Sequence, residues 1–252
     1  MHKTQKAGRG RQRIKYTLFC FGEAFAVFSL IRFAMMPKPV GIAMALLDAA
    51  LTALPLLIER FLSCDLALPV HLFAVCYAPG AMLGNSYGLY YSTSWWDKLL
   101  HFSGGVAFAF VGLYLILLLN KKGSVNRLTR ALFAVFLSVT VAVAWEFIEF
   151  GADKYLGQDM QKDRYVTEFN SCLLGPGDGV MKHVGDIQTV TVNGEELPGY
   201  VDIGLIDSME DLLIETAGAL LLAGAFLADK ENHPLVKKPS DKTGKHPLIK
   251  KK

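Results

Sequence analysis

Cysteine and charge are both scarce in this chain, and each shortage excludes a class of protein. Of 252 residues only four are Cys, and their spacing contains no Cys-x-x-Cys pair. Neither a disulfide framework nor a thiolate metal site is therefore expected. Charged residues make up 19% of the chain and hydrophobic residues 52%. That balance is too apolar for an ordinary soluble domain of this length, so a membrane protein is expected.

Six apolar stretches are long enough to cross a membrane as helices, which takes about 20 residues. They cover residues 16–35, 40–58, 66–87, 99–119, 131–150 and 203–227. Asp48 and Pro55 interrupt the second stretch, and the third contains His71, Pro79 and three glycines. The expected fold is an all-α integral membrane protein, a bundle of about six transmembrane helices.

One membrane domain, residues 16–227, is expected between a basic cytoplasmic N-tail (1–15) and a basic C-tail (228–252) that is predicted to be disordered. Most of the 26 Lys and Arg residues lie in these tails, near Arg60, or at positions 120–130. If six helices alternate, these segments share one side, and Lys and Arg favour the cytoplasmic side. We predict a bacterial inner-membrane protein with both termini in the cytoplasm. Its net charge of +3 then reflects topology and contact with membrane lipids, and no nucleic acid partner is expected.

A long loop, residues 151–204, is predicted on the extracytoplasmic side. Within it Thr and Val alternate over residues 187–192 and are followed by Asn193-Gly194. Alternation before Asn-Gly is typical of a β-hairpin with a tight turn. A small β-hairpin is therefore expected, lying on the outer face as a lid or a partner surface.

Acidic residues and one histidine gather at the predicted outer ends of three of the spans. Residues spaced three or four apart share one face of a helix, and each of these clusters has that spacing. Charged side chains at a membrane boundary are energetically costly, so their presence there indicates that they have a role. The candidate site residues, all proposed as catalytic, are Asp97, His101, Glu146, Glu149, Asp207 and Asp211.

So many carboxylates cannot share a dry pocket while all are ionised, so some must take up protons, pair with cations or bind a metal. Oxygen ligands suit Ca²⁺, Mg²⁺ or Mn²⁺, and one His admits Zn²⁺ or Fe²⁺. A divalent metal ion is the expected cofactor, with identity left open, and its candidate ligands are His101, Glu146, Glu149, Asp207 and Asp211. The alternative is that the acids only pair with Lys98, Lys154 or Arg32.

The motifs themselves resemble a known family. The runs Trp96-Asp-Lys-Leu-Leu-His-Phe102, Trp145-Glu-Phe-Ile-Glu149 and Ile206-Asp-Ser-Met-Glu-Asp211 with Gly218 resemble the YjdF-like family of bacterial multipass inner-membrane proteins. More distantly, the chain is similar to the VanZ-like family. Glu149 stands where that family has Gln, and Glu215 where it has Asn, so this site is the more acidic one.

Three functions stay open at this point. The first is a metal-dependent enzyme acting on a lipid or a lipid-linked envelope molecule at the outer face. The second is a cation- or proton-coupled transporter that uses the same acids. The third is a non-catalytic envelope protein whose charges only hold helices together. The oligomeric state does not follow from the sequence.

Overall fold

The computed structural model describes residues 2–62, 65–120 and 125–229, and nearly all of the predicted C-tail (228–252) lies outside them. Five helices are long and apolar enough to cross a membrane. They are α1 (His2–Met35), α2 (Pro39–Leu62), α6 (Trp96–Leu119), α7 (Arg127–Leu156) and α8 (Leu205–Ala228). The predicted all-α membrane architecture is confirmed.

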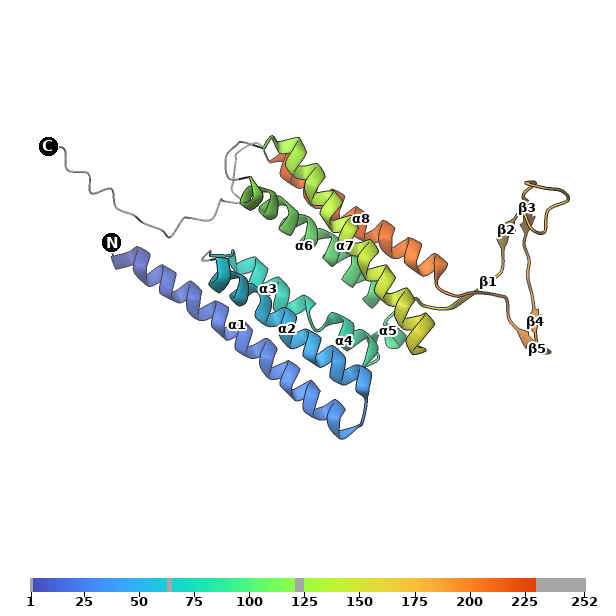
Figure 1. The fold of residues 1–252 in the computed structure, drawn as a ribbon, viewed down its shortest axis with the longest axis horizontal. Helices are drawn as coiled ribbons and strands as arrows, with labels where there is room; N and C mark the ends of the chain where they lie inside the picture. Colours follow the sequence, from blue (N-terminus) through green and yellow to red (C-terminus); the bar gives the residue numbers. More distant parts are fainter. Residues whose placement is uncertain (1, 63–64, 121–124, 230–252) are drawn as a thin grey trace.

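The third apolar stretch is not the continuous helix that the sequence suggests. Residues 66–87 form α3 (Leu68–Tyr77) and α4 (Gly80–Asn85), and a third short helix, α5 (Leu89–Ser92), follows directly after the stretch. The first break comes at Pro79, which has no backbone N–H to continue the hydrogen-bond ladder of α3. The second comes at Gly88, whose φ of 86° lies in the left-handed region that glycine adopts most readily. Helices α3 and α4 still run alongside α2 (Figure 1), whereas α5 packs against α4 and α6.

The helices form two groups that pack within themselves more than against each other. In the first, α1 packs against α2 and α3, and α2 packs against α3 and α4; in the second, α6, α7 and α8 all pack on one another. The second group has a core of small residues and a few large ones: Ala109, Leu113, Ala131, Ala134, Ala219, Ala223 and Phe226. Small residues let helix backbones approach closely, which is how helices associate in lipid.

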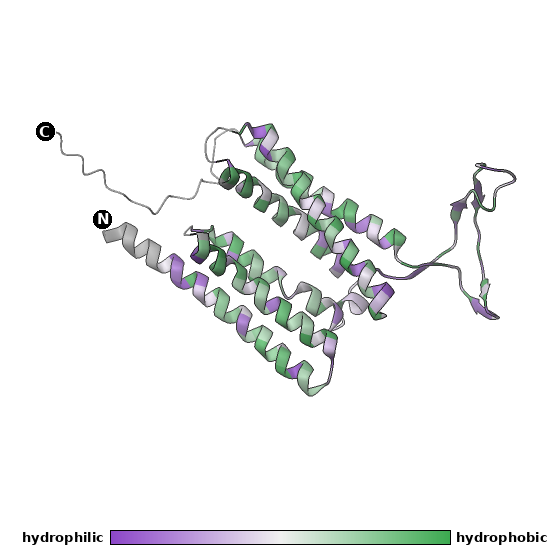
Figure 2. Ribbon diagram, in the orientation of Figure 1, coloured by the Kyte–Doolittle hydropathy of each residue, from purple (hydrophilic) through white to green (hydrophobic). Residues whose placement is uncertain are grey.

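Hydrophobic residues predominate along the long helices (Figure 2), and many large apolar side chains of both groups are exposed, as expected for helices that face lipid. Phe21 on α1, Phe61 on α2, and Phe136 and Phe147 on α7 are all well exposed. Polar side chains are instead buried between helices.

The start of α1 is fixed to the end of α2 by a buried lysine. Lys15 is fully buried, and its ammonium group donates to the Glu59 carboxylate, to Asp65 Oδ1 at 2.8 Å and to the Leu66 carbonyl at 2.7 Å. His71 Nε2 lies 3.3 Å from the same Glu59 oxygen. Because every proton of the ammonium has an acceptor, this buried charge is compensated.

The chain reverses direction at each end of the helices. The start of α1, the end of α2, the junction of α6 and α7, and the end of α8 all lie at one end (Figure 1). The loop between α7 and α8 leaves from the other end. This is the alternation from which the sequence topology was argued; which end faces the cytoplasm stays a prediction.

Three antiparallel strand pairs make up the loop between α7 and α8. They are β1 (Arg164–Val166) with β6 (Tyr200–Asp202), β2 (Phe169–Ser171) with β3 (Lys182–Val184), and β4 (Val190–Val192) with β5 (Glu195–Leu197). The predicted hairpin is β4–β5, turning at Asn193 and Gly194, both with positive φ. Strands β2–β5 extend away from the helices (Figure 1), so they do not form the lid that the sequence suggested.

Candidate functional site

The first turns of α6 supply one wall of the site. Asp97 lies in the first turn of α6, where the positive end of the helix dipole favours a carboxylate. One turn further, His101 shares its face, and its Nε2 atom lies 3.9 Å from Asp97 Oδ1. The predicted pairing across one helical turn is present.

The start of α8 supplies the facing wall. Asp207, Asp211 and Glu215 follow one another at four-residue intervals, and all three are buried. The start of the helix is fixed by Asp202, whose side chain accepts a hydrogen bond from the Ile206 backbone at 3.0 Å.

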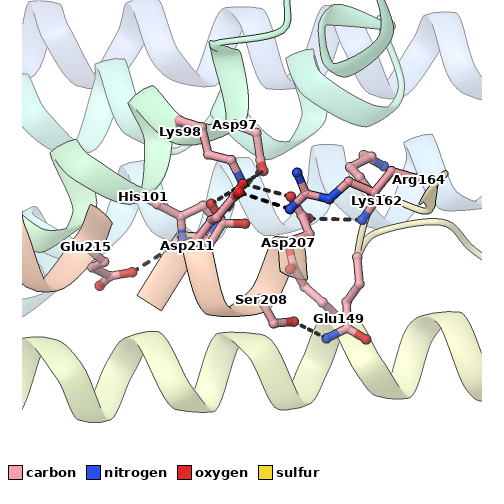
Figure 3. A network of polar contacts seen from close by, with 12 residues as sticks. Asp97, Lys98, His101, Glu149, Lys162, Arg164, Asp207, Ser208, Asp211 and Glu215 are labelled. Atoms are coloured by element: carbon pink, nitrogen blue, oxygen red, sulfur yellow. Dashed lines mark hydrogen bonds and ion pairs between the residues drawn. The ribbon is translucent and has the colours of Figure 1, made fainter. Parts of the chain in front are cut away.

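Lys98 joins these two walls. Its ammonium group donates to Asp207 Oδ1 at 2.7 Å and to Asp211 Oδ1 at 2.8 Å, and it lies 3.7 Å from Asp97 Oδ2 (Figure 3). The sequence suggested Lys98 only as a general counter-ion. The structure makes it the cation between two of the five candidate acids.

His101 lies between two carboxylates of α8. Its Nε2 atom is 3.7 Å from Asp211 Oδ2, and its Nδ1 atom is 3.5 Å from Glu215 Oε2 (Figure 3). A carboxylate beside each nitrogen fixes the orientation of the ring. Glu215, which was not among the predicted site residues, therefore belongs to the site.

A close helix crossing makes this geometry possible. A methyl group added to Gly105 of α6 would lie 2.0 Å from the Glu215 carbonyl oxygen, and one on Gly218 would lie 2.3 Å from the Phe102 carbonyl oxygen. No side chain fits at either place. These two glycines bring the backbones of α6 and α8 together beside His101.

Helix α7 completes the cluster with Glu146 and Glu149, both buried. The Trp145 indole donates to Glu149 Oε1 at 2.8 Å. Ser208 and Gln161 lie near Glu146 but hydrogen-bond to each other at 2.5 Å. Within the described part of the chain, neither oxygen of Glu146 has a hydrogen-bond partner.

The segment after α7 closes the outer end of the cluster. Asp153 accepts hydrogen bonds from the backbones of Met160 and Gln161 at 2.6 and 2.7 Å. The Lys162 backbone then donates to Asp207 Oδ2 at 3.0 Å. Asp153, which was not among the predicted site residues, thus helps to hold this connection against the start of α8.

The other two proposed counter-ions lie elsewhere. Lys154 lies over the rings of Phe150 and Tyr155, and Arg32 lies over the ring of Tyr87 at 4.7 Å. Among the described residues, no ion pair joins Lys154 or Arg32 to a site carboxylate. The expectation that they might neutralise the acids is wrong; both find aromatic faces instead.

Two sets of three residues have donor atoms close enough to hold one metal ion. Asp97, His101 and Asp211 form one set, and His101, Glu146 and Glu149 form the other; within each set the donor atoms lie within 4.8 Å of one another. Of the predicted ligands, only Asp207 is in neither set, because it holds Lys98 and the Lys162 backbone.

A cavity of about 280 Å³ opens beside the cluster, at the seam between the two helix groups. Its polar end is formed by Asp97, His101 and Glu215. Most of the remaining wall is apolar or aromatic, and includes Leu47, Leu51, Ala78, Ala81, Leu100, Phe108, Val141, Ala144 and Ile148. Leu47 and Ile148 are also exposed on the outside of the helices, so the cavity wall is continuous with the lipid-facing surface.

Comparison with known proteins places the chain in a family. Residues 18–231 match the model of a family described as predicted membrane protein, DUF2238. The chain belongs to this family. It corresponds to the YjdF-like family that the sequence motifs resemble, so that resemblance is confirmed. No curated protein matches the chain, and no solved structure matches it.

One further sequence motif does not correspond to a catalytic site. Residues Gly84-Asn-Ser-Tyr-Gly88 match the Gly-x-Ser-x-Gly motif of the hydrolase nucleophile elbow, which requires a sharp turn from a strand into a helix. Ser86 instead caps the end of α4, with no strand before it in the described chain. The acid–histidine cluster therefore remains the candidate functional site.

Proposed function

We propose that this protein is a membrane-embedded enzyme that acts on a lipid or lipid-linked envelope molecule, with its acid–histidine cluster as the active site. The observation that carries the proposal is the amphiphilic cavity. Asp97, His101 and Glu215 line one end of it, while its walls are otherwise mainly apolar or aromatic. Ligand pockets commonly combine apolar walls with a few convergent polar groups in this way.

The cavity suggests how such a substrate would lie. An acyl or isoprenoid chain would fill the apolar part, entering from the bilayer past Leu47 and Ile148, which are exposed to lipid. The bond to be broken or made would then lie at His101. A chain bound in this way restricts the orientation of the reacting group, which is a major source of rate enhancement.

The donor atoms of the cluster fit a divalent metal ion. Within the described chain both oxygens of Glu146, Oδ2 of Asp211 and Oε1 of Glu215 are buried without a hydrogen-bond partner, and unpaired buried carboxylates are costly. We propose that His101, Glu146 and Glu149 hold the ion, because neither Glu has a Lys partner. When bound, the ion would activate water or polarise a substrate oxygen.

The remaining residues have roles that follow from their contacts. Asp211 and Glu215 lie beside the two ring nitrogens of His101; with one nitrogen on the ion, the carboxylate beside the other nitrogen would hold the ring in its orientation. Lys98 neutralises part of the charge of Asp207 and Asp211. Asp97 lines the cavity beside His101 and is the candidate general acid or base.

The two alternatives have less support. A carrier needs polar groups along its path, yet the described core on the far side of Glu215 is the apolar cluster around Leu113 and Phe226. A purely structural role would pair each acid with a cation, yet among the described residues Glu146 and Glu149 have no ion pair with Lys or Arg. We propose that the site lies on the extracytoplasmic side of a bacterial inner membrane, because the site lies away from the end of the molecule where α1 begins and α8 ends (Figure 1), and the sequence is basic around those two points.

The test is metal content followed by lipid turnover. We expect the purified protein to carry a stoichiometric divalent ion by elemental mass spectrometry, and Glu146→Gln to lose it. Glu168→Gln, on an exposed strand connection, is the matched control and should keep it. Wild-type protein would next be incubated with a bacterial lipid extract, and products identified by lipid mass spectrometry. A folded, active wild type without metal would refute the metal assignment; absence of any product would refute the enzyme.

A further inference from the structure

The polar end of the cavity carries two carboxylates and one imidazole, that of His101, whose ring nitrogens already lie beside Asp211 and Glu215. Asp97 and Glu215 line it, and none of the described lining residues is Lys or Arg. Glu215 is 3% exposed, and within the described chain its Oε1 atom has no hydrogen-bond partner. A buried carboxylate oxygen without a partner, at the wall of a cavity, favours a ligand that donates hydrogen bonds.

The positive groups around the site are already engaged. Lys98 is bonded to Asp207 and Asp211. Lys162 is bonded to Asp159 and Arg164 pairs with Glu210 at 3.0 Å. Figure 3 shows Lys98, Lys162 and Arg164 gathered around the carboxylates. An anionic headgroup would therefore have to displace an existing ion pair before it met a free cation.

One bound divalent ion does not reverse this charge. Six carboxyl groups face Lys98 and His101 in the cluster, so the negative groups stay in excess after one ion is added. The excess needs protons or a cationic ligand to make it tolerable in a site of low dielectric constant.

Aromatic rings complete the surroundings. Tyr77, Tyr90 and Trp145 line the cavity together with Asp97 and Glu215. Aromatic faces with nearby carboxylates are the usual surroundings of ammonium groups, because the ring quadrupole attracts cations. The chain provides an example next to the cavity, where the Lys162 ammonium lies 5.2 Å from the centre of the Tyr90 ring.

We infer that the substrate class is an amine-bearing amphiphile, with its ammonium group between Glu215, Asp97 and the aromatic rings and its alkyl chain along the apolar wall. This inference rests on the proposed function, because it names the headgroup that the same cavity would select. The ammonium donates to Glu215 Oε1, which satisfies the unpaired oxygen. A phosphate or carboxylate headgroup would instead meet like charge.

The test uses three photoreactive probes that share one alkyl chain of twelve carbons with a diazirine, and differ in headgroup: a primary amine, an alcohol and a phosphate monoester. The protein is embedded in phosphatidylcholine nanodiscs and irradiated, and labelled positions are mapped by mass spectrometry. Labelling at Leu51 and Val141 in the cavity is divided by labelling at Phe136, an outward-facing residue of α7. That ratio corrects for how much of each probe enters the bilayer.

We expect the cavity ratio for the amine to exceed that for the phosphate by at least about tenfold, since hydrogen bonds to charged groups contribute roughly 1.5–3 kcal/mol. Glu215→Gln should reduce the amine ratio by about the same factor, while Glu168→Gln leaves it unchanged. The probe comparison on the wild type stands even if Glu215→Gln fails to fold.

The possible results separate two failures. Equal cavity ratios for the three probes, or a preference for the phosphate, would overturn the headgroup inference and leave the lipid enzyme in place. No cavity labelling by any probe would overturn the proposed function as well, because the cavity would then admit no chain.

Discussion

Replacing Gly105 by Ala tests whether the close crossing of α6 and α8 builds the site. The new methyl carbon would lie 2.0 Å from the Glu215 carbonyl oxygen, and that oxygen is backbone and cannot rotate away. Favourable carbon contacts lie at roughly 3.5–4.0 Å, so the helices must separate by more than about 1 Å. Since His101 Nδ1 is now 3.5 Å from Glu215 Oε2, that movement would break the contact between the two walls.

The expected cost is at least about 1–3 kcal/mol of unfolding free energy, the range for inserting a methylene into a packed core. Gly224→Ala is the matched control, because it lies on α8 and a methyl group there meets nothing within 4 Å. Unfolding would be followed by circular dichroism during titration of the micelle with a denaturing detergent, and divalent metal would be measured on the same samples.

We expect Gly105→Ala to unfold earlier than wild type and to carry less metal, and Gly224→Ala to match wild type in both. Equal stability and equal metal content of the two variants would refute the crossing as the cause of the site geometry. Loss of stability with normal metal content would show that α6 and α8 separate without disturbing His101.

Three further outcomes follow from buried charge and turn geometry. Lys98→Met leaves two buried aspartates without their cation and should lower the free energy of unfolding by about 3–5 kcal/mol in the same assay. Lys182→Met, on an exposed strand, is the control and should leave stability unchanged. Equal effects of the two substitutions would contradict the buried pairing. Lys15→Met should cost a similar amount, since Lys15 is fully buried, and exposed Arg13→Met should not. Gly194→Ala adds a side chain at φ 90° and should loosen only the β4–β5 hairpin, with faster amide exchange there; a change in metal content would contradict that independence.

The sequence predicted the helices wherever an apolar run was long and uninterrupted. It failed for residues 66–87, where Pro79 divides the run into α3 and α4, and Gly88 separates α4 from α5. Hydropathy averages over such breaks, whereas the backbone responds to each one. The β4–β5 hairpin was predictable because Asn193-Gly194 determines the turn locally, but β1–β6 joins residues that are far apart in sequence, which no local pattern indicates.

The candidate site was predictable only in part. Spacing placed Asp97 with His101, and Asp207 with Asp211, on common helix faces, and the structure brings these faces together. Spacing could not choose the cation, because a lysine side chain reaches several neighbours and its partner depends on how the helices pack. Nor did the spacing indicate how closely α6 and α8 approach. A glycine allows a close helix crossing only where the backbone of another helix packs against it, and the sequence does not show which helix that is.

The seam between the two helix groups divides the cavity into parts with different origins. All six candidate residues and Glu215 come from α6, α7 and α8, whereas Leu47, Leu51 and Ala78 come from α2 and the α3–α4 segment. Side chains on the α1–α5 side can therefore change in size without moving a single charged group of the cluster. That side of the wall could adapt to the chain length and branching of a bound amphiphile while the reactive groups, and the apolar wall that α6 and α7 supply, stay the same.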